Sequence, residues 1–519
     1  MQTRLSTSST AITILTAVSI GLGIVTQIVL ARWFGAGTDL DAYYAASSLP
    51  NLFTLVLTSS FNIIFVPIFL FYKEKDSVRD AWEVASSFIN FLVLALGAIV
   101  LFGVLFAPLI LRILTPGYAP GTPNYDLTLT MFRIQWPIIL FSGVNGVMAG
   151  IFYAHGRFLR PASTPVINSA AVLIFTLALR SQIGIVATAV GSLVGPILMT
   201  LWLLPLLLRN DHYKPTINWR HPGLRRVGRL GIPWIASNLF AKGTAVIDTM
   251  LTSFLMPGSL TYLNYAYRLV TMSVNLVTRG TALSIFPRIS RSYAQSNPDD
   301  FRLYFSTGIR FIGLIAIPAT GIIFTLREPV IRLLFEGNNF AQADTLATAQ
   351  VVAIYAGTLI SLSFGSIISN SFYAQHDTKT PAIIGAVGTL LRAGLAYVLL
   401  PYLSYLSLAL SFTIVSYGKV LTMIYLLHHK QVSLDGKNII FSLSKMTVSA
   451  LLMSVIIFVV WPRIDTIAIT KPVLLFTLII IVGAALALYI SLLFLLKSPE
   501  ILYIKQTIIT LRKQNNKIR

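Results

Sequence analysis

Residues 152–161, Phe-Tyr-Ala-His-Gly-Arg-Phe-Leu-Arg-Pro, recur 220 positions later as residues 372–381, Phe-Tyr-Ala-Gln-His-Asp-Thr-Lys-Thr-Pro. Two shorter matches share this spacing to within one residue: Tyr44-Ala45 with Tyr265-Ala266, and Val66-Pro67 with Phe286-Pro287. Several matches at one spacing predict an internal repeat of about 220 residues.

The chain is rich in apolar runs that are long enough to cross a bilayer. Of its 519 residues, 55% are hydrophobic and only 11% are charged, which is about half the charged share of a soluble domain. Runs of about 18–25 apolar residues match the hydrocarbon thickness at about 1.5 Å per helical residue. The fourteen predicted spans cover residues 9–30, 43–71, 84–106, 127–153, 163–179, 183–208, 231–255, 259–286, 303–325, 345–373, 381–400, 404–427, 439–461 and 472–496.

Six spans fit within each copy of the repeat, which predicts an all-α membrane protein with two six-helix lobes. Because six is an even number, both copies enter the membrane in the same direction, as a parallel repeat whose binding site lies between the halves near the midplane. The predicted parts are an N-lobe over residues 1–210, a C-lobe over 211–430, two further helices over 431–497 and a basic tail over 498–519.

The distribution of lysine and arginine predicts the orientation. Most of the 39 basic residues fall outside the spans on the side that holds both termini, including Arg225, Arg226 and Arg229 after the sixth span. By the positive-inside rule, both termini are cytoplasmic. This bias accounts for most of the net charge of +21 without a nucleic-acid partner. We expect a monomer, surrounded by membrane lipids, in the cytoplasmic (inner) membrane of a bacterium.

The sequence contains no recognisable catalytic or cofactor chemistry. It has no cysteine and only six histidines, so thiolate sites are excluded and no metal-ligand spacing is visible. Paired carboxylates and nucleophile–base sets are not recognisable either. We therefore expect no enzyme activity, no cofactor and no metal.

Charged residues within the predicted spans are the candidate functional residues, because each costs at least about 2.5–3.5 kcal/mol at a helix centre unless it faces protein or water. In the eighth span, Arg268 and Arg279 are three helical turns apart, and Asn264 and Asn275 fall on the same face. Lys242 belongs to a second polar stripe, in the seventh span. These stripes predict a wet, cationic cavity suited to phosphate or carboxylate. A buried ion-pair network between the halves is the alternative.

Several stretches resemble the MurJ (MviN) family of lipid II flippases, of the multidrug/oligosaccharidyl-lipid/polysaccharide exporter superfamily. They are residues 31–37 (Ala-Arg-Trp-Phe-Gly-Ala-Gly), 41–44 (Asp-Ala-Tyr-Tyr), 49–52 (Leu-Pro-Asn-Leu), 65–67 (Phe-Val-Pro), 264–269 (Asn-Tyr-Ala-Tyr-Arg-Leu) and 372–381. The resemblance covers roughly residues 10–430. It implies fourteen helices in two lobes that carry lipid II, the undecaprenyl-pyrophosphate-linked peptidoglycan precursor, from the inner to the outer leaflet.

The resemblance also assigns residues. Arg268 matches the arginine that the family uses in its cavity, and Asp41 matches the acid at the start of helix 2. The family's arginines in helices 1 and 2 have neutral residues here, at Ile20, Thr26 or Gln27, and Thr54 or Leu55. A flippase for another lipid-linked oligosaccharide, such as an O-antigen or exopolysaccharide unit, is therefore the alternative. A small-molecule antiporter, and then a membrane enzyme or scaffold, are less favoured.

Asp248 is the single acid deep within a predicted span. The resemblance places it where some relatives bind a cation, with Arg392 of helix 11 at the position of another ligand. An unpaired carboxylate is costly in the membrane. We therefore expect Asp248 to pair with Arg392 in place of a sodium ion, and rank Lys242 as the less favoured partner.

Overall fold

The computed structural model describes residues 2–75, 77–205, 213–215, 217–219, 221–430, 434–465 and 470–501. Within these ranges, the side chains of residues 2–9, 59, 62–63, 230, 233, 237, 241, 279–283 and 465 lie outside the description. The described residues form helices and connecting turns and contain no strand.

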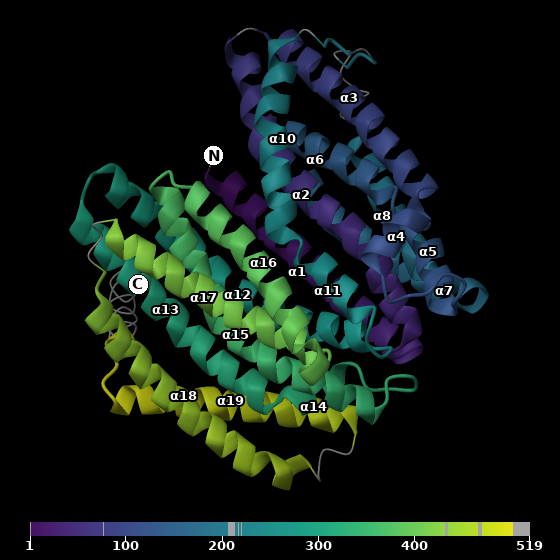
Figure 1. The fold of residues 1–519 in the computed structure, drawn as a ribbon. Coiled ribbons are helices and arrows are strands. Elements are labelled where there is room, and N and C mark those ends of the chain that lie inside the picture. Colours follow the sequence, from purple (N-terminus) through teal and green to yellow (C-terminus); the bar gives the residue numbers. More distant parts are fainter. Residues whose placement is uncertain are drawn as a thin grey trace. The chain divides into compact units, whose positions relative to one another are not determined.

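Two compact units make up the chain (Figure 1). Unit 1 comprises residues 1–261 and 337–340, and unit 2 comprises residues 262–336 and 341–519. The helices that lie in unit 1 are α1 (Gln2–Phe34), α2 (Thr38–Lys75), α3 (Val78–Leu105), α4 (Ala107–Leu114), α5 (Pro123–Gln135), α6 (Ile138–Ala154), α7 (Leu159–Ile183), α8 (Val186–Leu203), α10 (Pro222–Lys242) and α11 (Thr244–Thr252). The remaining helices are α12 (Ser259–Ala294), whose first turn counts with unit 1, α13 (Pro298–Thr325), α14 (Arg327–Leu334), α15 (Gln342–Ala374), α16 (Lys379–Leu403), α17 (Leu406–His429), α18 (Gly436–Asp465) and α19 (Lys471–Leu495).

Helix boundaries repeat at the spacing seen in the sequence. The short helix α4 and its counterpart α14 are 220 residues apart at both ends, and so are α7 and α16. Helices α8 and α17 begin 220 residues apart. These matches are independent of residue identity, and they support the repeat. The two units are defined by packing in space, whereas the predicted lobes are defined by the sequence repeat. The predicted lobe boundaries at residues 210 and 430 therefore stay a prediction.

The most similar stretches of the repeat are helix stops. After α6, Gly156 has φ 68° and the Arg157 N–H donates to the carbonyl of Phe152 at 2.9 Å. After α15, His376 has φ 58° and the Asp377 N–H donates to Phe372 at 3.0 Å. This six-residue bond with a left-handed residue before it satisfies carbonyls that the helix end leaves free. The motif recurs because both helices end at this position and the chain reverses its direction there.

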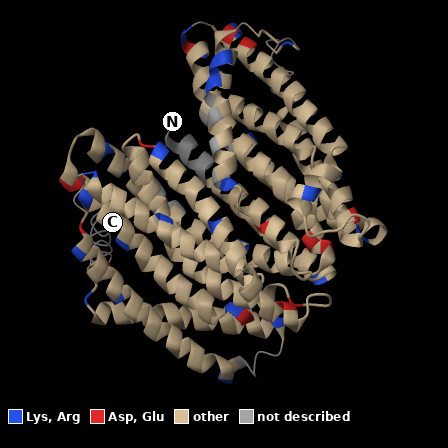
Figure 2. Cartoon of the chain, viewed as in Figure 1, with Lys and Arg blue, Asp and Glu red and all other residues tan. Residues whose placement is uncertain are grey.

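Eleven helical segments among the described residues are long and apolar enough to cross a membrane. The predicted spans 43–71, 231–255 and 259–286 are not among them. They correspond to α2, to α10 with α11, and to α12, and each of these contains side chains that lie outside the description. Figure 2 shows that charged residues lie mostly near helix ends and are sparse along most helices. An all-helical membrane protein is thus confirmed, and the count of fourteen spans stays a prediction.

Two predicted spans are interrupted. The span at 127–153 is divided into α5 and α6 at Trp136 and Pro137, because proline has no N–H to continue the helical hydrogen bonds. Its counterpart α15, with Gly357 at the matching position, is continuous. The span at 231–255 is divided into α10 and α11 at Gly243.

Helices α18 and α19, which lie outside the repeat, pack on α13 in unit 2. The contact is a cluster of buried apolar side chains from the three helices: Ile317, Met446, Ala450, Met453, Ile457, Leu474, Leu478, Ala485, Tyr489 and Leu493, with Leu326 directly after α13. The cluster fixes the two last helices to the body of unit 2.

Residues 337–340 leave unit 2 in the sequence and pack within unit 1. The side-chain amide of Asn339 donates to the carbonyl of Trp33, and the Asn339 N–H donates to the carbonyl of Arg32 at 3.4 Å. A Cβ atom on Gly337 would lie 2.9 Å from Cγ of Arg32. This turn therefore closes over the end of α1.

Candidate functional site

Helix α12 presents the candidate site. The helix runs without interruption from Ser259 to Ala294, so the spacing that placed the predicted residues on one face holds in the structure. Arg268 and Asn275 are exposed on this face, and Asn264 is half-buried. The backbone of Arg279 belongs to α12, but its side chain lies outside the described residues. The structure thus brings three of the four predicted residues onto one partly exposed stripe.

The Arg268 side chain is available for a ligand. Its guanidinium makes no hydrogen bond or ion pair with a described residue; its backbone carbonyl accepts a bond from Thr271 Oγ1 at 3.2 Å. Neighbouring Tyr267 packs edge-on against Tyr355 and Phe412, with ring centroids 5.8 and 5.7 Å away. These aromatic contacts hold this turn of α12 on α15 and α17, while Arg268 projects from it.

The polar stripe expected in the seventh span, which comprises Asn238, Lys242, Thr249 and Thr252, does not lie on one regular helix. Lys242 is the last residue of α10 and is half-buried, and the helix is broken at Gly243. Beyond the break, Thr249 and Thr252 are buried, and their hydroxyls donate to the carbonyls of Ala245 and Asp248 at 2.9 and 2.7 Å. The expectation assumed a regular helix of 100° per residue, and the break removes that register. A substrate-binding role for Lys242 stays a prediction.

Asp41 has a structural role in the described state. Its carboxylate is 4% exposed and accepts the N–H groups of Gly258 and Thr261 at 2.7 and 2.8 Å, together with the Thr261 hydroxyl at 2.6 Å. These donors form the first turn of α12, where free N–H groups and the helix dipole favour an anion. Asp41 therefore caps α12, and a direct contact with substrate stays a prediction.

Asp248 and Arg392 belong to different units, so their predicted pairing stays a prediction. Within unit 2, Arg392 is 2% exposed. Its Nη2 lies 3.5 Å from the carbonyl of Leu408, and its guanidinium lies 5.0 Å from the centre of the Phe412 ring. The residue is thus held between α16 and α17 by a weak hydrogen bond and a cation–π contact.

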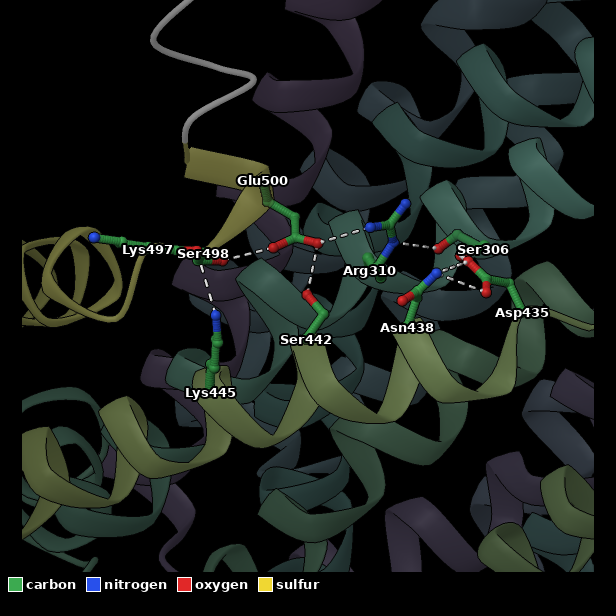
Figure 3. A network of polar contacts seen from close by, with 9 residues as sticks. All are labelled: Ser306, Arg310, Asp435, Asn438, Ser442, Lys445, Lys497, Ser498 and Glu500. Carbon is green, nitrogen blue, oxygen red and sulfur yellow. Dashed lines mark hydrogen bonds and ion pairs between the residues drawn. The ribbon is translucent and has the colours of Figure 1, made fainter.

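Arg310 belongs to a largely buried network of polar contacts (Figure 3). Its Nη1 lies 3.4 Å from Oε1 of Glu500, which is 4% exposed. The hydroxyls of Ser442 and Ser498 each donate to Glu500 at 2.6 Å. The carboxylate accordingly has three partners, and Arg310 serves to hold α13, α18 and the segment after α19 together.

Glu500 is the residue of this network that sequence reasoning missed. It falls within the predicted basic tail over residues 498–519, where a single acid gives little indication of a buried contact. The available signal was Ser498-Pro499-Glu500, since serine followed by proline and an acid is typical of a helix start.

An exposed ion pair closes the turn after α15. The Asp377 carboxylate accepts from Lys430 Nζ, and it also accepts from the N–H and hydroxyl of Thr380 at 2.9 and 2.6 Å. Partial burial raises the pKa of Asp377, but the hydrogen bonds from Lys430 and Thr380 outweigh it and lower the pKa to about 2. The pair connects the end of α17 with the start of α16.

No group of three or more His, Cys, Asp or Glu residues that could hold a metal ion is found in the described ranges. The described side chains on the α12 face, Arg268, Asn264 and Asn275, are a cation and two amides, which are groups that can bind an anion.

Comparison with known proteins gives one family for most of the chain. The family model described as "Lipid II flippase MurJ" matches residues 30–492. The probable lipid II flippase MurJ of Buchnera aphidicola (subspecies Acyrthosiphon pisum) is 27% identical over 455 residues, covering 87% of this chain and 89% of the relative. The lipid II flippase MurJ of Burkholderia cenocepacia is 27% identical over 398 residues, covering 75% and 77%.

Solved structures show the same fold. A lipid II flippase MurJ in an inward closed conformation superposes with a TM-score of 0.80 at 23% identity, covering 93% of this chain and 98% of that chain. A multidrug resistance MATE transporter of the MOP superfamily in an inward-facing conformation gives 0.68 at 14% identity, covering 81% and 96%. An outward-facing MATE conformation gives 0.58 at 14% identity, covering 82% and 95%.

Proposed function

Because the chain belongs to the lipid II flippase MurJ family, we propose that it moves lipid II across the bacterial inner membrane by alternating access, without chemical catalysis. The observation that carries this proposal is Arg268. It is an exposed arginine on a helix expected to lie within the membrane, and it forms no ion pair with a described residue. A guanidinium in that position must face water or a ligand, and the pyrophosphate of lipid II is a matching bidentate partner.

Helices α2, α12 and the α10–α11 pair form the polar part of the transport path in this proposal, because they carry Asp41, Arg268 and Lys242. They are the expected spans that are not among the eleven found in the described residues. With these helices counted, the chain has fourteen spans in two six-helix lobes plus α18 and α19.

The proposed substrate contacts are Arg268, Arg279, Asn264, Asn275 and Lys242. The two arginines supply paired N–H donors for the phosphates, and the asparagines and the lysine extend the polar surface. Asp41 acts beside this set by capping α12, and so holds the helix that carries both arginines.

The driving force follows from the proposed pairing of Asp248 with Arg392. A guanidinium beside the acid disfavours a second cation through like-charge repulsion. Transport is then independent of a sodium gradient, and the membrane potential acts on the anionic substrate. Replacing sodium by potassium in the transport assay is the test, and a collapse of transport contradicts this mechanism.

Orientation is the remaining part of the proposal, with both termini cytoplasmic. Fluorescence from a cytoplasm-only reporter fused after Arg519 supports it, and activity of a periplasm-only reporter at the same site contradicts it.

The test of the function itself is complementation of a strain depleted of its own lipid II flippase. Growth and export of labelled lipid II should both be restored. The alternative substrate, another lipid-linked oligosaccharide, is favoured by the neutral positions in helices 1 and 2. In the structure, Thr26 donates to the carbonyl of Leu22, and Gln27 accepts from the Tyr44 hydroxyl. Restored export of such a glycan without lipid II export would identify that alternative.

A further inference from the structure

The connection between α8 and α10 lies along α3 instead of crossing the surface freely. We call its described residues, 213–215 and 217–219, the strap. The Lys214 N–H donates to Ser86 Oγ at 3.1 Å, and the Asn218 N–H donates to Ser87 Oγ at 3.0 Å. The side-chain amide of Asn218 also donates to Glu83 Oε1 at 2.7 Å. Backbone and side chain of the strap are thus bonded to α3.

Both ends of the strap are held. The Tyr213 hydroxyl donates to Asn90 Oδ1 at 2.7 Å, and Asn90 Nδ2 donates back to the carbonyl of Lys214 at 3.0 Å. At the other end, the Trp219 ring meets Phe91 edge-on, with centroids 5.5 Å apart. The strap is therefore attached over its described length.

The surface of α3 that receives the strap is complementary to it. Glu83, Ser86, Ser87 and Asn90 recur every three or four residues, so they form one polar face of the helix. Ser86 and Ser87 are each 1% exposed. The irregular backbone of the strap needs hydrogen-bond partners for its N–H and carbonyl groups, and the polar stripe on the apolar helix α3 needs hydrogen-bond partners too. The strap and the polar stripe therefore satisfy each other's hydrogen-bonding groups.

The start of α10 continues the attachment. A Cβ atom on Gly223 would lie 2.8 Å from Val84 and 2.9 Å from the Tyr72 ring, so only glycine allows this approach. The His221 ring packs edge-on against Tyr72 at 5.2 Å, and Val227 is 3% exposed. The first turns of α10 therefore pack against α2 and α3 of unit 1.

We propose that the strap stays clamped to α3 throughout the transport cycle, so that the start of α10 moves with unit 1. The joint between the moving parts then lies after the strap, toward residue 261 where unit 1 ends, and not in the connection between the repeats. This inference rests on the proposed alternating access. It is carried by the five hydrogen bonds described above and by the close packing of Gly223.

A disulfide between strap and helix tests the proposal. The chain has no cysteine, so Ser87→Cys with Asn218→Cys introduces a single pair. Oxidation should join the two cysteines, seen as loss of maleimide labelling and as a linked peptide by mass spectrometry. Lipid II transport should be the same before and after oxidation. Transport that stops on oxidation and returns with dithiothreitol means that the strap detaches, which overturns the inference.

The reduced protein provides the reference for the function itself. If the reduced double variant does not transport lipid II although the cysteine-free chain does, the pair Ser86→Cys with Lys214→Cys replaces it. If the cysteine-free chain does not transport, the proposed function fails and the strap is then judged by hydrogen exchange. Slow exchange of the 213–219 amides in both inward- and outward-locked protein supports the clamp, and fast exchange in one of them refutes it.

Discussion

Replacing Arg268 by alanine separates substrate binding from folding. The side chain is exposed, and its guanidinium bonds to no described residue, so folding loses little. A surface substitution of this kind changes the free energy of unfolding by no more than about 0.5 kcal/mol.

The cost to substrate binding is larger. A hydrogen bond to a charged group contributes about 1.5–3 kcal/mol, which corresponds to about a 10- to 150-fold loss of affinity for each bond removed. A bidentate arginine–phosphate contact contains two such bonds. Arg268→Lys should recover part of the loss, since lysine keeps the charge but not the two parallel donors.

The assay is export of labelled lipid II in vesicles, with thermal unfolding of the same preparations in parallel. Arg291→Ala is the matched control, because it removes an exposed arginine from the last turn of the same helix. We expect Arg268→Ala to abolish transport with an unchanged melting temperature and Arg291→Ala to retain transport. Full transport by Arg268→Ala, or equal loss in both variants, would refute the role of the α12 face.

Three further predictions concern the remaining charged residues. Arg392→Ala should reduce thermal stability more than the double change with Asp248→Ala, because the single variant leaves the half-buried carboxylate of Asp248 unmatched; equal losses would contradict the pair. Asp41→Ala should lower the unfolding free energy by about 0.5–2 kcal/mol through loss of the α12 cap, and an unchanged melting temperature would show that the cap is dispensable. The pKa of Asp377 is lowered to about 2, below about 3.9 for an unfolded chain. The contribution of Asp377 to the free energy of unfolding is therefore present above about pH 4 and is lost as the pH falls toward 2. Asp377→Asn should flatten the pH dependence of the free energy of unfolding in that window.

Much of the fold could be predicted from the sequence because the repeat includes its helix stops. The turn at Gly156 and its counterpart at His376 end matching helices, and their flanking residues are similar enough to be recognised. The breaks within helices could not be predicted in the same way. Gly243 separates α10 from α11 within the seventh predicted span. Gly23, at the same position of the repeat, lies within the continuous α1. A glycine permits a break, and the surrounding packing decides whether it occurs.

The placement of Arg268 and Asn275 on one face could be predicted from the sequence, whereas their role as substrate contacts stays a prediction. Arg268 and Asn275 share a face because α12 is unbroken. Contacts between residues distant in the sequence could not be predicted: the carboxylate of Asp41 accepts hydrogen bonds from the first turn of α12, and its expected contact with substrate stays a prediction. Glu500 and the strap were missed for the same reason, because their partners are distant in the sequence.

The turn at residues 337–340 has a consequence for how the protein is made. Unit 1 is not complete when its own stretch of chain, up to residue 261, has left the ribosome. The contact between Asn339 and the end of α1 forms only after α12, α13 and α14 have been synthesised. The end of α1 therefore lacks its contact with Asn339 while about 300 further residues are synthesised, at about 5–20 residues per second. Over that interval of tens of seconds, the backbone carbonyls of Arg32 and Trp33 are open to other partners, such as the insertion machinery or a chaperone.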